Sequence, residues 1–134
     1  MTDAIARDVV WRRAQDRCEY CRLPQRAIDA TFHVEHILAR QHSPPDEDSP
    51  ENLALACHHC NVHKGTNLTS IDPVGGLVVA LYHPRRDDWS EHFALRGAQI
   101  VGLTPTGRAT VQLLQFNTQR RLELREDLIA DGQF

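Results

Sequence analysis

Four cysteines carry the clearest chemical signal in the sequence. They form two Cys-x-x-Cys pairs, Cys18 with Cys21 and Cys57 with Cys60, and 35 residues separate the pairs. Paired motifs of this kind typically supply the four thiolates of one structural zinc site. Disulfides and a redox-active Cys-x-x-Cys are the alternatives. Disulfides need an oxidising compartment, and a redox motif occurs singly in a βαβ pattern that this sequence does not show. One bound Zn²⁺ per chain is therefore the favoured prediction.

A second set of polar residues lies between and after the cysteine pairs. Glu35 and His36 occupy a segment expected to be extended, and Asn52 precedes a short apolar run. Asn61 directly follows Cys60. With the cysteines, this combination resembles the HNH endonuclease family, the ββα-metal nucleases, in the branch with a four-cysteine zinc frame. The matching motifs are Cys18-Glu-Tyr-Cys21, His33-Val-Glu-His-Ile37, Glu51-Asn-Leu53 and Cys57-His-His-Cys-Asn-Val-His-Lys-Gly65.

The resemblance implies a role for each of these residues. His36 corresponds to the general base that deprotonates the attacking water, and imidazole titrates near neutral pH. Glu35 and Asn61 correspond to ligands of a catalytic metal, and their oxygen atoms suit Mg²⁺ or Mn²⁺. Asn52 corresponds to the central asparagine, which braces the loop between the strands and so orients His36. Lys64, on nearly the same helix face as Asn61, is expected to hold a DNA phosphate.

Each of these side chains also has an ordinary structural interpretation. A histidine on a strand is usually a surface or hydrogen-bonded side chain, and we expect that of His33. Asn52 and Asn61 could serve only as local caps. Two departures from the family pattern are present: Ala39 replaces a frequent proline, and Glu35 replaces the commoner aspartate. Neither removes a group that the mechanism needs.

The composition limits the classes of protein that fit. Fifteen basic and eighteen acidic residues give a net charge of −3, and a single lysine, Lys64, stands among fourteen arginines. DNA binding would therefore need a locally basic surface. The longest strongly apolar run, residues 77–82, is far shorter than a membrane helix of roughly 20 residues. Charges near the N-terminus also disagree with a signal peptide, so we expect a cytoplasmic protein.

The elements that must position these residues can be predicted from the sequence pattern. We expect a helix over residues 4–16 capped by Asp3, an extended segment over 31–38, and a surface loop over 41–52. A strand over 53–56 and a helix over 57–64 that ends at Gly65 should follow. Beyond them, the sequence predicts further elements: a strand over 77–82, two or three short strands or a strand pair within 92–116, and a helix over 117–130 capped by Asn117.

The second half of the chain should complete the DNA-binding surface. The predicted hairpin and helix carry few cations, whereas Arg85 and Arg86 lie near a turn where guanidinium groups can reach phosphates. These arginines could equally form a solvated turn with Asp87 and Asp88. The segments 82–86, 89–93 and 107–111 also resemble the extension of small stand-alone bacterial HNH proteins.

We therefore predict one α+β domain. Residues 1–72 would form an HNH nuclease core, a ββα-metal hairpin and helix clamped by the zinc site, and residues 73–134 a C-terminal α+β extension. The predicted function is metal-dependent cleavage of DNA, by nicking or, with two sites in a possible homodimer, through both strands. The main alternative is a non-catalytic zinc module that binds nucleic acid or protein.

Overall fold

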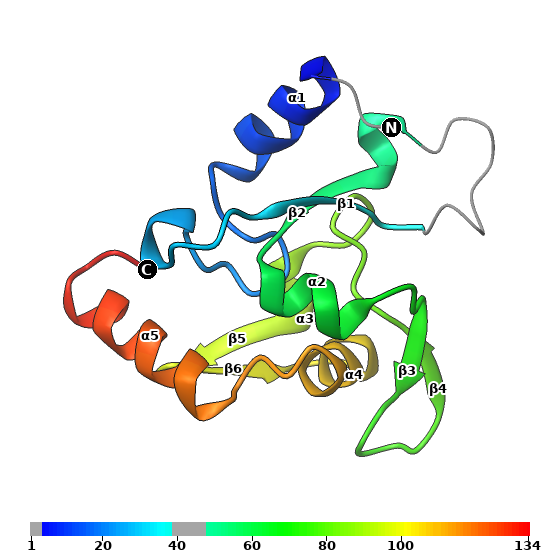
Figure 1. Cartoon of the computed structure of the whole chain (residues 1–134). Helices are drawn as coiled ribbons and strands as arrows, with labels where there is room; N and C mark the ends of the chain where they lie inside the picture. The colour runs from blue at the N-terminus through cyan, green and yellow to red at the C-terminus, as the bar shows by residue number, and fades with distance from the viewer. Residues whose placement is uncertain (1–3, 39–47) are drawn as a thin grey trace.

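The computed structural model describes residues 4–38 and 48–134 of the chain. Short helices surround three two-stranded antiparallel hairpins in this part of the molecule (Figure 1). The helices are α1 (Ala4–Ala14), α2 (His58–Lys64), α3 (Trp89–His92), α4 (Pro105–Leu113) and α5 (Gln119–Ala130), with single 3₁₀ turns at Gln25–Ala27 and Pro50–Asn52. The strands are β1 (His33–His36), β2 (Leu53–Ala56), β3 (Thr69–Ile71), β4 (Val78–Ala80), β5 (Phe93–Arg96) and β6 (Gln99–Gly102).

The predicted α+β class and the ββα order are confirmed. β1 and β2 pair so that His33 lies opposite Ala56 and His36 opposite Leu53. All four residues of β2 are buried, because α1 and α2 both pack against this strand. At the start of α2, the Cys57 sulfur accepts a hydrogen bond from the Cys60 backbone N–H. The helix ends at Gly65, whose φ of 55° suits glycine.

Helix α1 is confirmed. Ala6 and Val10 face the core, whereas Ile5 is 78% exposed. The predicted Asp3 cap, Ala39 and most of the 41–52 loop lie outside the described residues.

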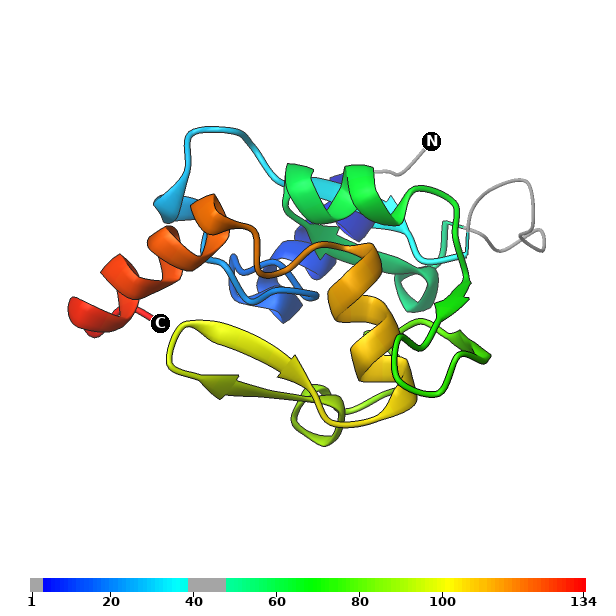
Figure 2. The ribbon, with the colours of Figure 1, turned by 90° about the horizontal axis from the view of Figure 1, so that it is seen from below.

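The second half contains one helix that the sequence pattern did not predict. The expected strand pair is present as β5 and β6, and residues 105–113 after it form helix α4. Thr104 caps the helix by accepting from the Gly107 N–H, and Pro105 occupies its first turn, which is a helix-start signal. Figure 2 shows α4 beside the β5–β6 hairpin. A Cβ on Gly107 would lie 2.1 Å from the His92 carbonyl oxygen, so this close packing requires glycine.

Helix α5 is confirmed, although its cap differs from the prediction. Thr118 occupies the N-cap position. The Asn117 side chain instead bonds the backbone of Ile100, accepting at 2.9 Å and donating at 2.8 Å. The buried residues of α5 are two arginines, Arg121 and Arg125, while Ile129 is 41% exposed.

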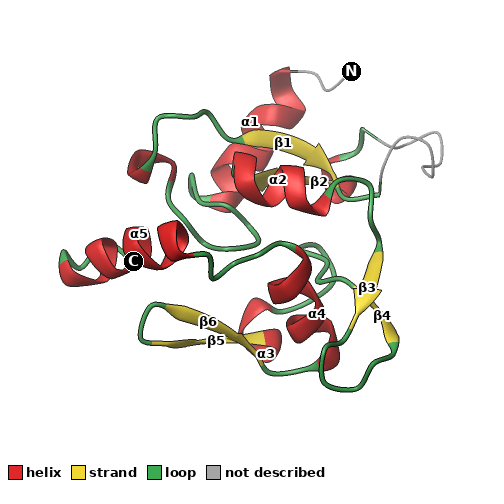
Figure 3. Cartoon of the chain, turned by 60° about the horizontal axis from the view of Figure 1, so that its bottom comes forward, coloured by secondary structure: helices red, strands yellow, loops and turns green. Residues whose placement is uncertain are grey.

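One hydrophobic core joins the two halves of the chain. It runs from Ala6 and Val10 on α1, through the buried cysteines, to Leu114 and Phe116 after α4. Figure 3 shows the β1–β2 hairpin with α1 and α2 in the upper part and the remaining elements below them. The β3–β4 pairing of Ile71 with Val78 crosses residue 72, where we placed the boundary between core and extension. No helix in the described ranges is long and apolar enough to cross a membrane.

Candidate functional site

The four cysteines meet in one buried cluster, as the sequence predicts. Their sulfur atoms all lie within 4.8 Å of one another, and the Cys21 and Cys57 sulfurs are 3.8 Å apart. Tetrahedral zinc with bonds of about 2.3 Å would hold its sulfur ligands about 3.8 Å apart, so the cluster fits Zn²⁺. Hydrogen bonds from the other three cysteines lower the pKa of Cys57, whereas burial raises the pKa of Cys18. Four thiolates leave no open coordination position, so this site is structural.

Local backbone geometry presents the first cysteine pair. The Cys18 N–H donates to Leu23 O at 2.9 Å, and the Arg22 N–H donates back to Cys18 O at 2.9 Å. Arg22 adopts a φ of 69°, which turns the chain tightly after Cys21. The second pair is positioned by the first turn of α2. A tight loop and a helix start therefore bring together cysteines that are far apart in the sequence.

His36 ends β1 and bonds to a carboxylate from the far side of the following loop. Its Nε2 lies 2.7 Å from Asp48 Oδ1, and its side chain is 15% exposed. Asp48 was not among the predicted site residues. The sequence places Asp46, Glu47 and Asp48 in one acidic run, and no periodicity indicates which of them returns to the histidine.

Asn52 connects the two ends of the same loop. Its side-chain oxygen accepts from Leu38 N–H at 2.9 Å, and its amide donates to Leu38 O at 3.1 Å. The Ile37 N–H also donates to Asn52 O at 2.8 Å. These contacts hold the chain just after His36.

Glu35 is not open to a metal in this structure. It is 7% exposed, its Oε1 accepts a hydrogen bond from the Tyr20 hydroxyl, and its Oε2 lies 3.6 Å from Lys64 Nζ. Burial raises the pKa of Glu35, and the Lys64 charge opposes that rise. The Lys64 ammonium and a divalent cation would compete for this carboxylate. The predicted Glu35–Asn61 metal site therefore does not fit the side chains as they lie. Asn61 itself is half-buried, one turn before Lys64 on α2.

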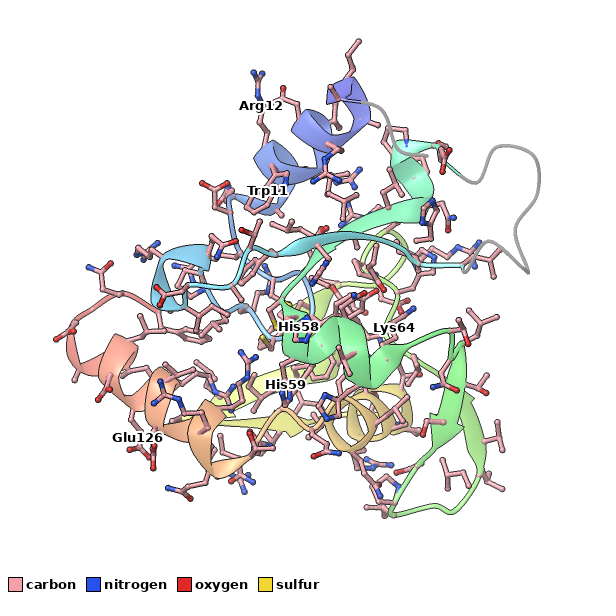
Figure 4. The ribbon with its side chains drawn as sticks, viewed as in Figure 1. Trp11, Arg12, His58, His59, Lys64 and Glu126 are labelled. Carbon is pink, nitrogen blue, oxygen red and sulfur yellow. The ribbon has the colours of Figure 1, made fainter. Side chains whose placement is uncertain are left out.

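The predicted phosphate contact of Lys64 is wrong for the same reason. Lys64 is 3% exposed, and its ammonium donates to Ile37 O at 3.1 Å. It lies near the end of α2 (Figure 4) and ties that helix to the end of β1. Lys64 is therefore a structural cation that neutralises Glu35.

Arg85 and Arg86 have different environments. The Arg85 side chain is 10% exposed and pairs with Glu19, and burial lowers its pKa to about 10, so it stays charged at neutral pH. It cannot reach a phosphate as we predicted. Arg86 is exposed. It lines a cavity of about 670 Å³, together with Asn52 from the hairpin loop and His83 from the segment after β4.

Comparison with known proteins agrees with this geometry. Residues 18–67 match the model of the family described as HNH endonuclease. No curated protein and no solved structure matches the chain. The matched segment contains all four cysteines, the β1–β2 hairpin and α2. Residues 18–67 are therefore similar to the HNH endonuclease family.

Proposed function

We propose that this protein is a nuclease that hydrolyses phosphodiester bonds in DNA, with His36 as its general base. The family match over residues 18–67 is the observation that carries the proposal. The His36–Asp48 contact at the end of β1 supports it, because a general base needs a fixed ring orientation.

The Asp48 contact determines which nitrogen of His36 can act. A carboxylate accepts a proton donor, so the neutral imidazole carries its proton on Nε2 and its free lone pair on Nδ1. Nδ1 then takes the proton of a water that attacks the phosphorus. Asp48 stabilises the imidazolium that this transfer creates. Asn52 maintains the loop geometry that makes the contact possible.

The arrangement of Glu35 and Lys64 does not support a divalent metal bound to Glu35. Lys64 already neutralises that carboxylate, so the proposed mechanism has no step at a metal held by Glu35. The pairing of Glu35 with Lys64 also favours a second candidate function, a zinc module that binds DNA without cutting it.

The DNA-contacting cation that remains from our predicted set is Arg86. It is exposed and lines the same cavity as Asn52, whose side chain bonds the backbone of Leu38 just after His36. Each chain would cut one strand. A double-strand break would then require repeated nicking or two chains acting together.

Incubation of the zinc-loaded full-length chain with supercoiled plasmid tests the proposal. Parallel reactions contain Mg²⁺, Mn²⁺ or neither, and gel electrophoresis separates supercoiled from nicked plasmid. We expect nicked circles to accumulate with time in at least one of the three reactions. Binding of the plasmid without cleavage under all three conditions would contradict the proposal and favour the non-catalytic module.

A further inference from the structure

A cavity lies between the segment that matches the HNH family and the second half of the chain. Its volume is about 670 Å³, and ligand pockets typically measure about 300–1,000 Å³. Among the described residues, apolar side chains form much of its lining: Ile37, Leu38, Leu68, Ala80 and Leu81. A cavity that combines apolar walls with a few polar groups favours an organic ligand over a bare ion.

The cavity adjoins the part of the chain that carries the proposed general base. Ile37 and Leu38, which line it, directly follow His36. The Asn52 side chain, which bonds the Leu38 backbone, lines it as well. A ligand in the cavity therefore contacts the residues that hold the end of β1.

The second half of the chain contributes a hydrogen-bonded turn over residues 83–87. The N–H groups of Arg86 and Asp87 donate to His83 O at 3.1 and 2.9 Å, and Asp87 Oδ2 accepts from the His83 N–H at 2.9 Å. His83 Nδ1 accepts from the Arg85 N–H at 3.1 Å, so the neutral ring carries its proton on Nε2. Burial lowers the pKa of His83, which keeps the ring neutral at pH 7. The turn thus brings a neutral ring donor and the exposed Arg86 guanidinium group to the cavity in a preformed arrangement.

These groups together suit a nucleobase and its phosphate. A nucleobase is a flat ring that can lie against apolar side chains, and its edge carries acceptors for donors such as His83 Nε2–H. Carboxylates such as Glu51, which also lines the cavity, accept from exocyclic amino groups. Arg86 suits a phosphate. Bases in a duplex are stacked and paired, so only an unstacked nucleotide can enter a concave cavity.

We propose, building on the proposed nuclease function, that this cavity binds an unstacked nucleobase of the DNA strand. The chain then prefers DNA with an unpaired nucleotide over a fully paired duplex, because that nucleotide has already lost its pairing and much of its stacking. Through Ala80, His83 and Arg86, the second half of the chain takes part in choosing the substrate.

The experiment compares the affinities of the full-length, zinc-loaded protein for matched DNA oligonucleotides. These are a paired duplex, the same duplex with an extra unpaired deoxycytidine, and the same duplex with an abasic site at that extra position. Fluorescence anisotropy measures binding, and gel electrophoresis of the same samples shows how much DNA remains intact.

Two variants of β4 separate the cavity from general electrostatic effects. Ala80→Glu places a carboxylate at the cavity wall. Val78→Glu is the matched control, because it adds the same charge two residues earlier on the same face of the strand, outside the cavity lining. Both positions are exposed, so both variants should fold.

We expect wild type and Val78→Glu to bind the duplex with unpaired deoxycytidine at least about tenfold more tightly than the paired or the abasic duplex. Ala80→Glu should lose this preference and bind the paired duplex as Val78→Glu does. Equal wild-type affinities for the deoxycytidine and abasic duplexes would overturn the proposal, as would an unchanged preference in Ala80→Glu. Binding of free deoxycytidine monophosphate without any preference among the duplexes would also overturn it, since the ligand would then be a free nucleotide.

These binding measurements do not depend on cleavage. A preference for the unpaired base without plasmid nicking would contradict the nuclease function and still support the base site. Nicking without that preference would contradict the base site alone. If Ala80→Glu does not fold, the wild-type comparison of the deoxycytidine and abasic duplexes decides.

Discussion

At the scale of single residues, the contact between His36 and Asp48 has the most direct consequence for activity. Asp48→Asn would retain the side chain's shape but allow the amide to donate to the ring, favouring the wrong tautomer. We expect cleavage to slow by about 10²- to 10⁴-fold, because an orienting carboxylate is lost. The rate of plasmid nicking measures this effect. Glu51→Gln, exposed in the same loop, is the control. Equal rates for both variants would show that Asp48 does not orient the base.

The buried pair of Glu35 and Lys64 makes a prediction about stability. Lys64→Met would leave Glu35 buried without its cation, and breaking a buried pair typically costs about 3–5 kcal/mol. Urea unfolding followed by tryptophan fluorescence measures the free energy of unfolding. Lys64→Met combined with Glu35→Gln should be more stable than Lys64→Met alone, since no uncompensated charge remains. A loss below about 1 kcal/mol for Lys64→Met would contradict a structural role for the pair.

The His36–Asp48 and Glu35–Lys64 pairs could not be predicted from the sequence, whereas the cysteine cluster could. The cysteine cluster could be predicted because zinc requires four thiolates, and fixed Cys-x-x-Cys spacing supplies them in twos. The burial of Lys64 could not be predicted from the sequence. Helix periodicity places Lys64 near Asn61, but it does not show that Lys64 pairs with Glu35, which Tyr20 also contacts. The choice of Asp48 could not be predicted, because no local pattern distinguishes it from the neighbouring Asp46 and Glu47.

At the scale of elements, a buried carboxylate connects the β3–β4 hairpin to α4. Both oxygens of Asp72 accept from Arg108 at 2.8 Å, and they also accept from the N–H groups of Val74 and Gly75 in the turn. These hydrogen bonds, led by those from Arg108, hold the pKa of Asp72 well below its usual range. Asp72 therefore stabilises the hairpin's position only while it is ionised.

This geometry predicts an acid-sensitive contribution to stability. Because the folded-state pKa of Asp72 is depressed, its contribution is fully present above the unfolded pKa of about 4 and is lost as the pH falls below it. Asp72→Asn should lower the melting temperature at pH 7 and flatten its decline between pH 4 and pH 2. Thermal unfolding at several pH values tests this, with the exposed Asp127→Asn as control. A decline as steep as that of wild type would contradict it.

Elements were predictable where local signals agreed with one another. Residues that favour extended structure predicted β1, the short apolar run over residues 53–56 predicted β2, and the terminating Gly65 helped to predict α2. Helix α4 was not predicted because β-branched residues such as Thr110 and Val111 favour strands, although the Thr104–Pro105 cap favours a helix. Close packing against His92, possible only with Gly107, reverses the usual penalty for glycine in a helix.

At the scale of the whole molecule, zinc should be a condition of folding. The cysteines belong to the core that joins α1, the hairpin and the segment after α4. Metal binding in such a site is itself folding free energy. Cys57→Ser should therefore bind less than one zinc per chain and lose its cooperative thermal transition. Elemental analysis and circular dichroism measure both. A stably folded, metal-free protein with four free thiols would contradict this prediction.

Whether the chain is a nuclease depends on His36, and one comparison tests that claim most directly. His36→Ala and His33→Ala alter two histidines of the same strand, and His33 is the exposed one. Zinc content and plasmid affinity are measured first, so that only chemistry differs. The account predicts that His36→Ala nicks supercoiled plasmid about 10²- to 10⁴-fold more slowly than wild type, whereas His33→Ala retains activity. Undiminished nicking by His36→Ala would contradict it.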